Sequence, residues 1–408
     1  MNTATWRLAS PENRQVPVAA PGEFRVLEIG ALSVWPPVVL APMAGVTNYP
    51  FRALCRSQGA GLYVSEMITA RGFLMGNRLT HKLAYFGPDE TPRSLQIYSS
   101  EPRDVAEMVR RLVAEERVDH LDMNLGCPVR KVTRAGGGSA IPLKPRLLAR
   151  LVRAAVENAG AVPFTVKMRK GIDESLPTFL EAGRVAQEEG AAAVGLHART
   201  AAQLYSGSAD WEAIGALAAA LRVPVLGNGD IWECWDALRM MRQTGCRGVI
   251  VGRGCLGRPW LFRELAQVFA GQEPDPPPNL GAILEVMIDH AQRLVAFFGE
   301  AQGLRQMRKW AAWYTKGFRG SSAVRGELVR LESLAQLRQL VGQLDLAEPF
   351  PVTALRAHRA KGSQTQKVSL PEGYLEQRED DRSMGELGAP EGDACGESED
   401  AEEAFSGG

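Results

Sequence analysis

Several features that identify common protein classes are missing from this chain of 408 residues. Its six cysteines include no CxxC pair, so the sequence indicates neither a disulfide framework nor a zinc site. No apolar run is long enough to span a bilayer, and residues 1–20 contain no continuous apolar stretch of the kind found in secretion signals. We therefore expect a cytoplasmic protein with no metal and no membrane partner, and we expect it to be a monomer.

The chain also lacks net charge, because 47 basic and 47 acidic residues cancel. The charge is unevenly distributed, however. Residues 371–408 contain 13 acidic residues and two arginines, a net charge of −11, which leaves +11 on residues 1–370. A basic body suits a polyanionic partner such as nucleic acid. The acidic segment has few aromatic residues, so we predict a disordered tail that either masks the basic body or simply improves solubility.

Eight short apolar runs recur along the chain with helix-like segments between most of them. The runs are Val38–Gly45, Leu62–Met67, Ser94–Tyr98, His120–Cys127, Phe164–Arg169, Ala193–Arg199, Pro224–Asp230 and Gly248–Gly254. Near-continuous apolar strands that alternate with helices predict a parallel sheet covered on both faces. Eight such units favour an α/β fold of the (β/α)₈ TIM-barrel type, and an open doubly wound sheet is the alternative.

A helical region is predicted after the barrel. The proline-rich segment Glu273–Asn279 indicates a linker, and helix-period apolar positions follow it, which indicates a small helical bundle. The predicted organisation is an N-terminal extension (1–33), the barrel (34–272), a linker (273–280), the helical domain (281–345), a further segment (346–370) and the acidic tail (371–408).

The helical domain combines basic and aromatic residues. The aromatic ones are Trp310, Trp313, Tyr314 and Phe318, and the basic ones include Arg305, Arg308 and Lys309. This mixture suits contact with phosphates and stacking on bases, which would make the domain an RNA-binding one. Equally, the aromatic residues could form the core of the domain with the charges in water.

Polar residues collect at the C-terminal ends of the eight runs, where barrel enzymes build their active sites. Cys127 and Asn124 end the fourth run, and this cysteine could be a proton donor, a nucleophile or a core residue. Lys167 lies near the end of the fifth run and needs an anion or a carboxylate partner if it is buried. His197 lies near the end of the sixth run and could donate a hydrogen bond or serve as a packed core residue. Arg199 follows it.

The last two runs end in glycine-rich loops. Gly227–Asp230 reads GNGD, and Gly252–Gly254 reads GRG with Arg253 at its centre. Glycines let backbone N–H groups approach an anion closely, and an arginine adds a charged fork. The pair of loops predicts a phosphate site, although either loop alone could be a simple tight turn.

Taken together, these motifs resemble the tRNA-dihydrouridine synthases, most closely the bacterial B-type subfamily. The resemblance spans roughly residues 38–344. The matching segments are Ala41–Asn48 (APMAGVTN), Asn124–Pro128 (NLGCP), Gly138–Ala140 (GSA), Val166–Arg169 (VKMR), His197–Thr200 (HART), Tyr205–Trp211 (YSGSADW) and Asn228–Ile231 (NGDI).

The resemblance implies an FMN-binding TIM barrel with a helical tRNA-binding domain, and NADPH-dependent (or NADH-dependent) reduction of the C5=C6 bond of particular uridines. Cys127 would be the proton donor. The implied cofactor-binding residues are Pro42, Met43, Ala44, Gln96, Lys167, His197, Asn228, Gly229, Asp230, Gly252 and Arg253. The resemblance implies that Asn124 grips the uracil. We further predict substrate contacts from the basic residues Lys131, Arg134, Arg199, Arg305, Arg308 and Lys309.

The sequence departs from the family pattern at two places. Trp310 stands where the family usually has a histidine, so a polar contact to tRNA is not expected there, although an indole can stack. The run Gly136–Gly138 is richer in glycine than usual, which indicates a mobile loop beside Cys127. Two other functions remain open at this stage: an FMN oxidoreductase for a free pyrimidine, such as a dihydroorotate or dihydropyrimidine dehydrogenase, and a non-catalytic RNA-binding protein.

Overall fold

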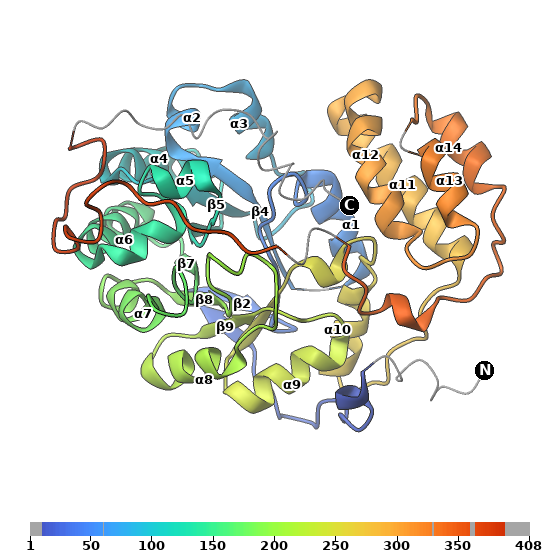
Figure 1. The fold of residues 1–408 in the computed structure, drawn as a ribbon, viewed down its shortest axis with the longest axis horizontal. Coiled ribbons are helices and arrows are strands. Elements are labelled where there is room, and N and C mark those ends of the chain that lie inside the picture. Colours follow the sequence, from blue (N-terminus) through green and yellow to red (C-terminus); the bar gives the residue numbers. More distant parts are fainter. Residues whose placement is uncertain (1–9, 60, 329, 360–363, 388–408) are drawn as a thin grey trace.

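Eight parallel strands close into a barrel in the computed structural model (Figure 1), which describes residues 10–59, 61–328, 330–359 and 364–387. Each strand pairs with the next along the chain, and β10 pairs with β3 to close the ring. The strands are β3 (Val38–Leu40), β4 (Leu62–Thr69), β5 (Ser94–Tyr98), β6 (His120–Leu125), β7 (Phe164–Arg169), β8 (Ala193–His197), β9 (Val225–Asn228) and β10 (Gly248–Val251). The predicted barrel fold is confirmed. Seven of the eight predicted runs contain a whole strand, and the run Leu62–Met67 covers all but the last two residues of β4.

Helices connect the strands around the outside of the barrel. They are α1 (Tyr49–Gln58), α2 (Ala70–Leu74), α3 (Arg78–Leu83), α4 (Pro102–Ala114), α5 (Arg130–Arg134), α6 (Pro145–Ala159), α7 (Phe179–Glu188), α8 (Trp211–Ala220), α9 (Cys234–Thr244) and α10 (Leu261–Phe269). All residues of β8, β9 and β10 are buried. Strands covered on one side by helices and on the other by the barrel interior have no face left for polar residues, which explains their continuous apolar sequences.

The strand register brings the predicted site residues to one end of the barrel. Asn124 on β6 pairs with Lys167 on β7, Arg169 on β7 pairs with His197 on β8, and His197 pairs with Asn228 on β9. These residues lie at or near the C-terminal ends of four neighbouring strands. They therefore form a continuous arc at the mouth of the barrel.

The N-terminal extension packs against the barrel. It contains a short hairpin of β1 (Leu27–Ile29) and β2 (Leu32–Val34), and Leu27 and Ile29 are fully buried. Near its start, Asn13 donates a hydrogen bond to Asp236 of α9 (2.9 Å). The described part of the extension is thus part of the barrel's packing.

The helical region after the barrel contains α11 (Leu280–Phe298), α12 (Glu300–Tyr314), α13 (Ser321–Leu328) and α14 (Leu334–Val341). It packs on α1 of the barrel, where the rings of Phe51 and Trp310 lie 4.4 Å apart. Lys309 of α12 also donates a hydrogen bond to the carbonyl oxygen of Gly45 in the loop after β3 (2.6 Å). The helical region and the mouth of the barrel are therefore in direct contact.

The aromatic residues of this region are core residues. Trp310 is completely buried, and Trp313, Tyr314 and Phe318 are at most 5% exposed. They cannot stack on a nucleic-acid base, so that sequence interpretation was wrong and the alternative of a packed aromatic core is correct. The reason is that both roles place aromatic residues at helical spacing, and sequence pattern alone does not separate them.

The start of the acidic tail also differs from expectation. Residues 364–387, here called the C-terminal strap, run across the barrel toward α5 and α6 (Figure 1). Tyr374 is 2% exposed and packs with Leu143 and Ile172 in a small separate apolar cluster. Disorder from residue 371 onward was therefore a wrong prediction for residues 371–387. The remainder of the predicted tail, 388–408, lies outside the described residues.

None of the described helices combines the length and the apolar character that crossing a membrane would require.

Candidate active site

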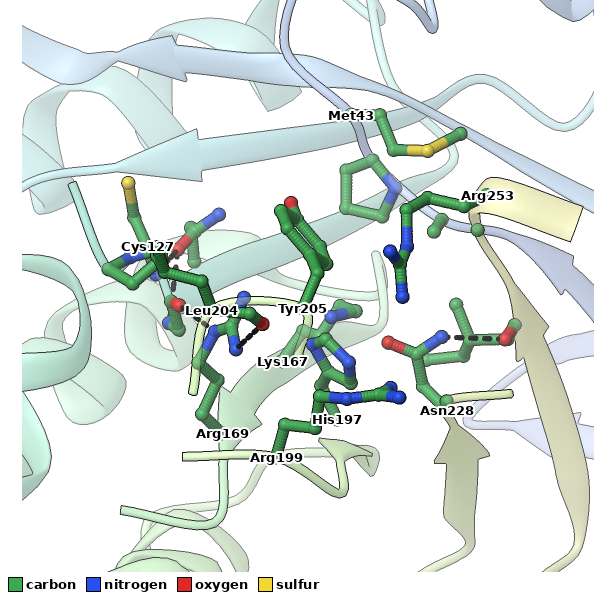
Figure 2. Close-up of a pocket in the computed structure, with 18 of the residues that line it drawn as sticks. Met43, Cys127, Lys167, Arg169, His197, Arg199, Leu204, Tyr205, Asn228 and Arg253 are labelled. Carbon is green, nitrogen blue, oxygen red and sulfur yellow. Dashed lines mark hydrogen bonds between the residues drawn. The ribbon is translucent and has the colours of Figure 1, made fainter. Parts of the chain in front are cut away.

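An open cavity lies at the mouth of the barrel. Most of the predicted site residues line it. They are Pro42, Met43, Ala44, Gln96, Asn124, Cys127, Lys167, His197, Arg199, Asn228, Gly229, Asp230, Gly252 and Arg253. Figure 2 shows Cys127 on one side of this cavity and Met43, Asn228 and Arg253 on the other.

A tight turn after β6 carries the thiol of Cys127. The N–H groups of Gly126 and Cys127 both donate to Asn124 Oδ1, at 3.1 and 2.9 Å. The side-chain oxygen of Asn124 therefore holds the backbone of the turn, as an aspartate or asparagine side chain does in an Asx turn. The thiol is half-buried. Burial raises the pKa of Cys127 above its usual value, although a backbone hydrogen bond from Val129 and the charge of Arg169 oppose the shift.

Four cationic side chains line the cavity: Lys167, Arg169, Arg199 and Arg253. Burial, together with the charge of nearby Arg169, lowers the pKa of Lys167 to about 8, while Asp122 opposes the shift. His197 lies among these cations, and burial and their charges together lower its pKa well below its usual value. His197 is therefore neutral at pH 7, and the site as a whole attracts anions.

The end of the cavity at β9 and β10 fits a phosphate group. Arg253 is held over the rings of Tyr205 and Trp232, with its guanidinium carbon 4.4 and 5.3 Å from their centroids. Its Nη1 atom and Nη1 of Arg199 are buried without a hydrogen-bond partner. Two unpaired buried guanidinium nitrogens are costly unless an anion binds them. Burial lowers the pKa of Arg253 to about 10, which still leaves it charged.

Gly229 keeps this end of the cavity open. Its φ of +127° is in the region that favours glycine, and a Cβ there would lie 2.6 Å from the Cβ of Ala209 and 3.7 Å from Nη1 of Arg199. A side chain at this position would therefore clash with Ala209 and come into van der Waals contact with the unpaired nitrogen. The observed arrangement supports the predicted phosphate site.

Two of the predicted contact residues pair with each other. Arg199 Nη2 donates to both carboxylate oxygens of Asp230 (2.7 and 2.9 Å), and Arg199 also donates to the carbonyl oxygens of Ser206 and Gly207. Arg199 is 1% exposed. It therefore holds the loop after β8 and offers only Nη1 to a ligand. In the same way, Asn228 uses its amide nitrogen to donate to the carbonyl oxygen of Ile250 (2.8 Å).

The other predicted substrate contacts lie outside the cavity. Lys131 and Arg134 are exposed on α5, directly after the Cys127 turn, and Arg305 is exposed on α12. Arg308 and Lys309 are half-buried, and Lys309 binds the Gly45 carbonyl oxygen, as described above. The structure thus separates the predicted residues into a cavity set and a surface set on two different elements.

Sequence reasoning missed Tyr205 as a site residue. Its ring lies between the Cys127 side and the Arg253 side of the cavity (Figure 2), with the guanidinium carbons of Arg169 and Arg253 5.5 and 4.4 Å from the ring centroid. Tyr205 belongs to the matched segment Tyr205–Trp211, so the motif contained it, but its position comes from the loop that Arg199 holds. Met67 and Trp232 also line the cavity without having been predicted to, and so does Arg169, which the sequence placed at the C-terminal end of its run without assigning it a role.

The C-terminal strap binds the loops beside the thiol. Gln366 Nε2 donates to the carbonyl oxygens of Pro128 (2.7 Å) and Ala201 (3.1 Å), and Tyr374 donates its hydroxyl hydrogen to the carbonyl oxygen of Gly136 (3.1 Å). The segment after Cys127 is therefore tied to the strap at two points.

The glycine run of this segment has a packing role. A Cβ at Gly137 would overlap the Tyr98 hydroxyl, and one at Gly136 would lie 2.8 Å from Met384 and 3.1 Å from Tyr374. These glycines let the strap and Tyr98 approach the backbone closely. The predicted mobile loop is thus, in this structure, a loop packed beneath the strap.

Comparison with known proteins adds to this geometry. The family model described as "Dihydrouridine synthase (Dus)" matches residues 39–348. The chain is 49% identical over 381 residues to a "Probable tRNA-dihydrouridine synthase" of Mycobacterium tuberculosis (strain CDC 1551 / Oshkosh), covering 91% of this chain and 96% of the relative. It is 41% identical over 312 residues to "tRNA-dihydrouridine synthase B" of Xanthomonas axonopodis pv. citri, covering 75% and 92%. The match spans the barrel, the helical region and all the cavity residues, and the chain belongs to the dihydrouridine synthase family.

Proposed function

We propose that this enzyme reduces the C5=C6 bond of uridines in tRNA to 5,6-dihydrouridine, with FMN as its resident cofactor and NADPH as the electron donor. Three features support the proposal: the family membership, the names of the relatives and the basic body of the chain. The observation that carries it is that one cavity is lined by the thiol of Cys127, by four cationic side chains, and by two buried guanidinium nitrogens, of Arg199 and Arg253, that have no hydrogen-bond partner.

The cavity residues suit the parts of FMN. Arg253, Nη1 of Arg199 and the glycine loops would hold its phosphate. Lys167 and the amide of Gln96 would bind polar atoms of its ring, and Pro42, Met43 and Ala44 would pack against it. When bound, FMN supplies a hydride acceptor and donor, which no protein side chain can provide.

The role of Cys127 follows from the chemistry of uracil. Its C5=C6 bond is conjugated with the C4 carbonyl group, so addition of a hydride at C6 leaves negative charge on C5 and O4. A proton must then reach C5 for the product to form. The raised pKa of Cys127 keeps the thiol protonated at neutral pH, so that it is a suitable general acid. The thiolate that remains is stabilised by the charge of Arg169 until solvent reprotonates it.

Exposed basic residues on two elements are suited to hold the tRNA backbone around this cavity. Lys131 and Arg134 lie on α5, directly after the Cys127 turn, and Arg305 lies on α12 of the helical region. Because they stand on separate elements, they would contact different phosphates of one folded RNA.

The first prediction tests this function with Cys127→Ala. We expect this variant to bind FMN and to be reduced by NADPH like the wild type, because Cys127 is not in the phosphate cradle. Dihydrouridine formation should fall about 10²- to 10⁴-fold, the usual contribution of a general acid. The measurement is mass spectrometry of tRNA after incubation, with flavin absorbance followed in parallel.

Cys395→Ser is the matched control, since it also removes one thiol but lies in the region 388–408. It should form product at the wild-type rate. Normal product formation by Cys127→Ala would remove the thiol from the mechanism. A purified wild-type protein without flavin absorbance, or one that reduces free uracil as well as tRNA, would contradict the proposed function itself.

A further inference from the structure

A chain of hydrogen bonds runs inside the barrel from β5 through β6 and β7 and ends at the Cys127 turn. Its members are Ser94, His120, Thr165, Asp122, Gln96 and Asn124. Except for half-buried Asn124, all are at most 6% exposed. Asp122 lies in the middle of the chain and is the only carboxylate in it.

The direction of the bonds on the Cys127 side follows from the backbone. Asn124 Oδ1 accepts from two N–H groups, so its amide nitrogen must face Gln96. That nitrogen donates to Gln96 Oε1 (2.8 Å). The amide nitrogen of Gln96 must then face Asp122, and it donates to Oδ2 (2.7 Å). If the side-chain amide of either Gln96 or Asn124 were rotated by 180°, two hydrogen-bond donors would face each other.

The direction on the other side follows from protonation. Thr165 donates its hydroxyl hydrogen to Asp122 Oδ1 (2.6 Å), so its oxygen must accept from His120 Nε2 (3.0 Å). Burial lowers the pKa of His120 to about 4, which leaves the neutral ring with an acceptor at Nδ1 for the hydroxyl of Ser94 (2.7 Å). Both halves of the chain thus converge on the carboxylate of Asp122.

We infer that Asp122 is a positioning residue for Cys127: its carboxylate fixes the amide of Gln96, Gln96 fixes the amide of Asn124, and Asn124 holds the turn that carries the thiol. The inference rests on the proposed function for its meaning, because it is the proton donor that is positioned. The same arrangement leaves Gln96 and Asn124 each with a second amide N–H that is not used in the chain. Both residues line the cavity, so these N–H groups can donate to a bound molecule.

Asp122 is poorly explained as a stabilising residue. Burial raises its pKa to about 6, against the opposing hydrogen bonds from Thr165 and Gln96. A carboxyl group whose pKa is higher in the folded chain than in the unfolded one opposes folding when ionised, and this loss of stability grows as the pH rises from about 4 to 6. A charge kept at such a cost is consistent with a positioning role.

The test compares three variants in the FMN-bound enzyme, all with Cys395→Ser. Asp122→Leu keeps the branched shape but removes both acceptors. Asp122→Asn keeps an oxygen that accepts from Gln96. Its new amide N–H can donate to the hydroxyl of Thr165 if Thr165 then donates to His120 and the other ring nitrogen of His120 donates to Ser94. Asp119→Asn is the matched control: it lies three residues earlier, in a half-exposed pair with Arg93.

The first measurement is the rate at which iodoacetamide alkylates Cys127. Cys55, Cys234, Cys246 and Cys255 are buried, so Cys127 is the accessible thiol of the described residues in this background. We expect alkylation at least five times faster in Asp122→Leu, because its turn is no longer held, and within twofold of the parent in Asp122→Asn and Asp119→Asn. This measurement needs no tRNA, so it tests the inference even if the wild type reduces no uridine.

The second measurement is steady-state reduction of tRNA. Asp122→Leu leaves the buried donors of Gln96 and Thr165 without their acceptor and so lowers the unfolding temperature. At a temperature where every variant is folded, it should lower kcat at least tenfold with KM within threefold, and Asp122→Asn should recover most of the loss. Parent-like alkylation and kcat in Asp122→Leu would overturn the inference. Equal defects in Asp122→Leu and Asp122→Asn would also overturn it, because the charge and not the hydrogen-bond direction would then be the cause.

Discussion

At the scale of single residues, the cavity concentrates positive charge that its acids only partly balance. Asp230 pairs with Arg199, while Lys167 and Arg253 have no described carboxylate within hydrogen-bond distance. Such an arrangement is unfavourable in an empty site and favourable around a bound phosphate and an electron-rich ring. Lys167, His197 and Arg253, whose pKa values burial lowers, are also residues expected to bind the cofactor.

The pH dependence of FMN binding tests the role of Lys167. Its pKa is lowered to about 8 by burial and Arg169, with Asp122 opposing, so it is charged at pH 7 and largely neutral at pH 9. We expect FMN to bind the apoprotein more weakly as the pH rises through this range, by up to about tenfold per unit. Fluorescence quenching of FMN measures the affinity. Lys167→Met should bind weakly at both values and lose this pH dependence. An affinity that is independent of pH in the wild type would contradict the role.

At the scale of elements, the strands were predictable and the loops were not. Each strand is buried on both sides, so its apolar run is visible in the sequence. Tyr205 reaches the cavity only because Arg199 binds the carbonyl oxygens of Ser206 and Gly207, and no local pattern reports such a contact. The strap was missed for a similar reason. Residues 371–387 share the acidic composition of the rest of the tail, and a few side chains such as Tyr374 supply their order.

The strap provides a prediction at this scale. Tyr374→Phe keeps the packed ring but leaves the Gly136 carbonyl oxygen without its donor. Removing a hydrogen bond of this kind costs about 1 kcal/mol, which corresponds to roughly a fivefold increase in local opening. We expect Cys127 to be alkylated faster by about that factor, in the Cys395→Ser background.

Arg382→Ala is the control for the strap, because Arg382 pairs with Asp380 within the strap itself. This variant should react at the parent rate. If Tyr374→Phe also reacts at the parent rate, the strap does not restrain the loop that carries the thiol.

At the scale of the whole molecule, the barrel and the helical region together present basic residues that a single RNA could contact. The contacts of α1 with α12, and of Lys309 with Gly45, hold the two parts together. The surface set of Lys131, Arg134 and Arg305 therefore keeps a fixed spacing, which suits recognition of a rigid, folded RNA more than that of a flexible strand.

The salt dependence of tRNA binding separates surface residues from core residues. Each of Lys131→Ala, Arg134→Ala and Arg305→Ala should reduce the slope of log affinity against log salt by about 1 for every phosphate that the variant no longer binds. Trp310→Phe should leave the slope unchanged and instead lower the free energy of unfolding by about 1–3 kcal/mol, since it leaves a cavity in a closed aromatic core. Filter binding at several salt concentrations and thermal unfolding measure the two effects. An altered slope in Trp310→Phe would place the indole in the RNA interface after all.

The strap follows the barrel and the helical region in the sequence, and this order has a consequence for biosynthesis. During translation the eight strands and the helical region leave the ribosome before residues 364–387, because proteins are made from the N-terminus. The barrel of a nascent chain can thus form before the strap makes its hydrogen bonds to the loop that follows Cys127. The strap, made after the barrel and the helical region, completes the surroundings of Cys127, and we expect a chain that stops or is cleaved before residue 364 to fold but to have an impaired active site.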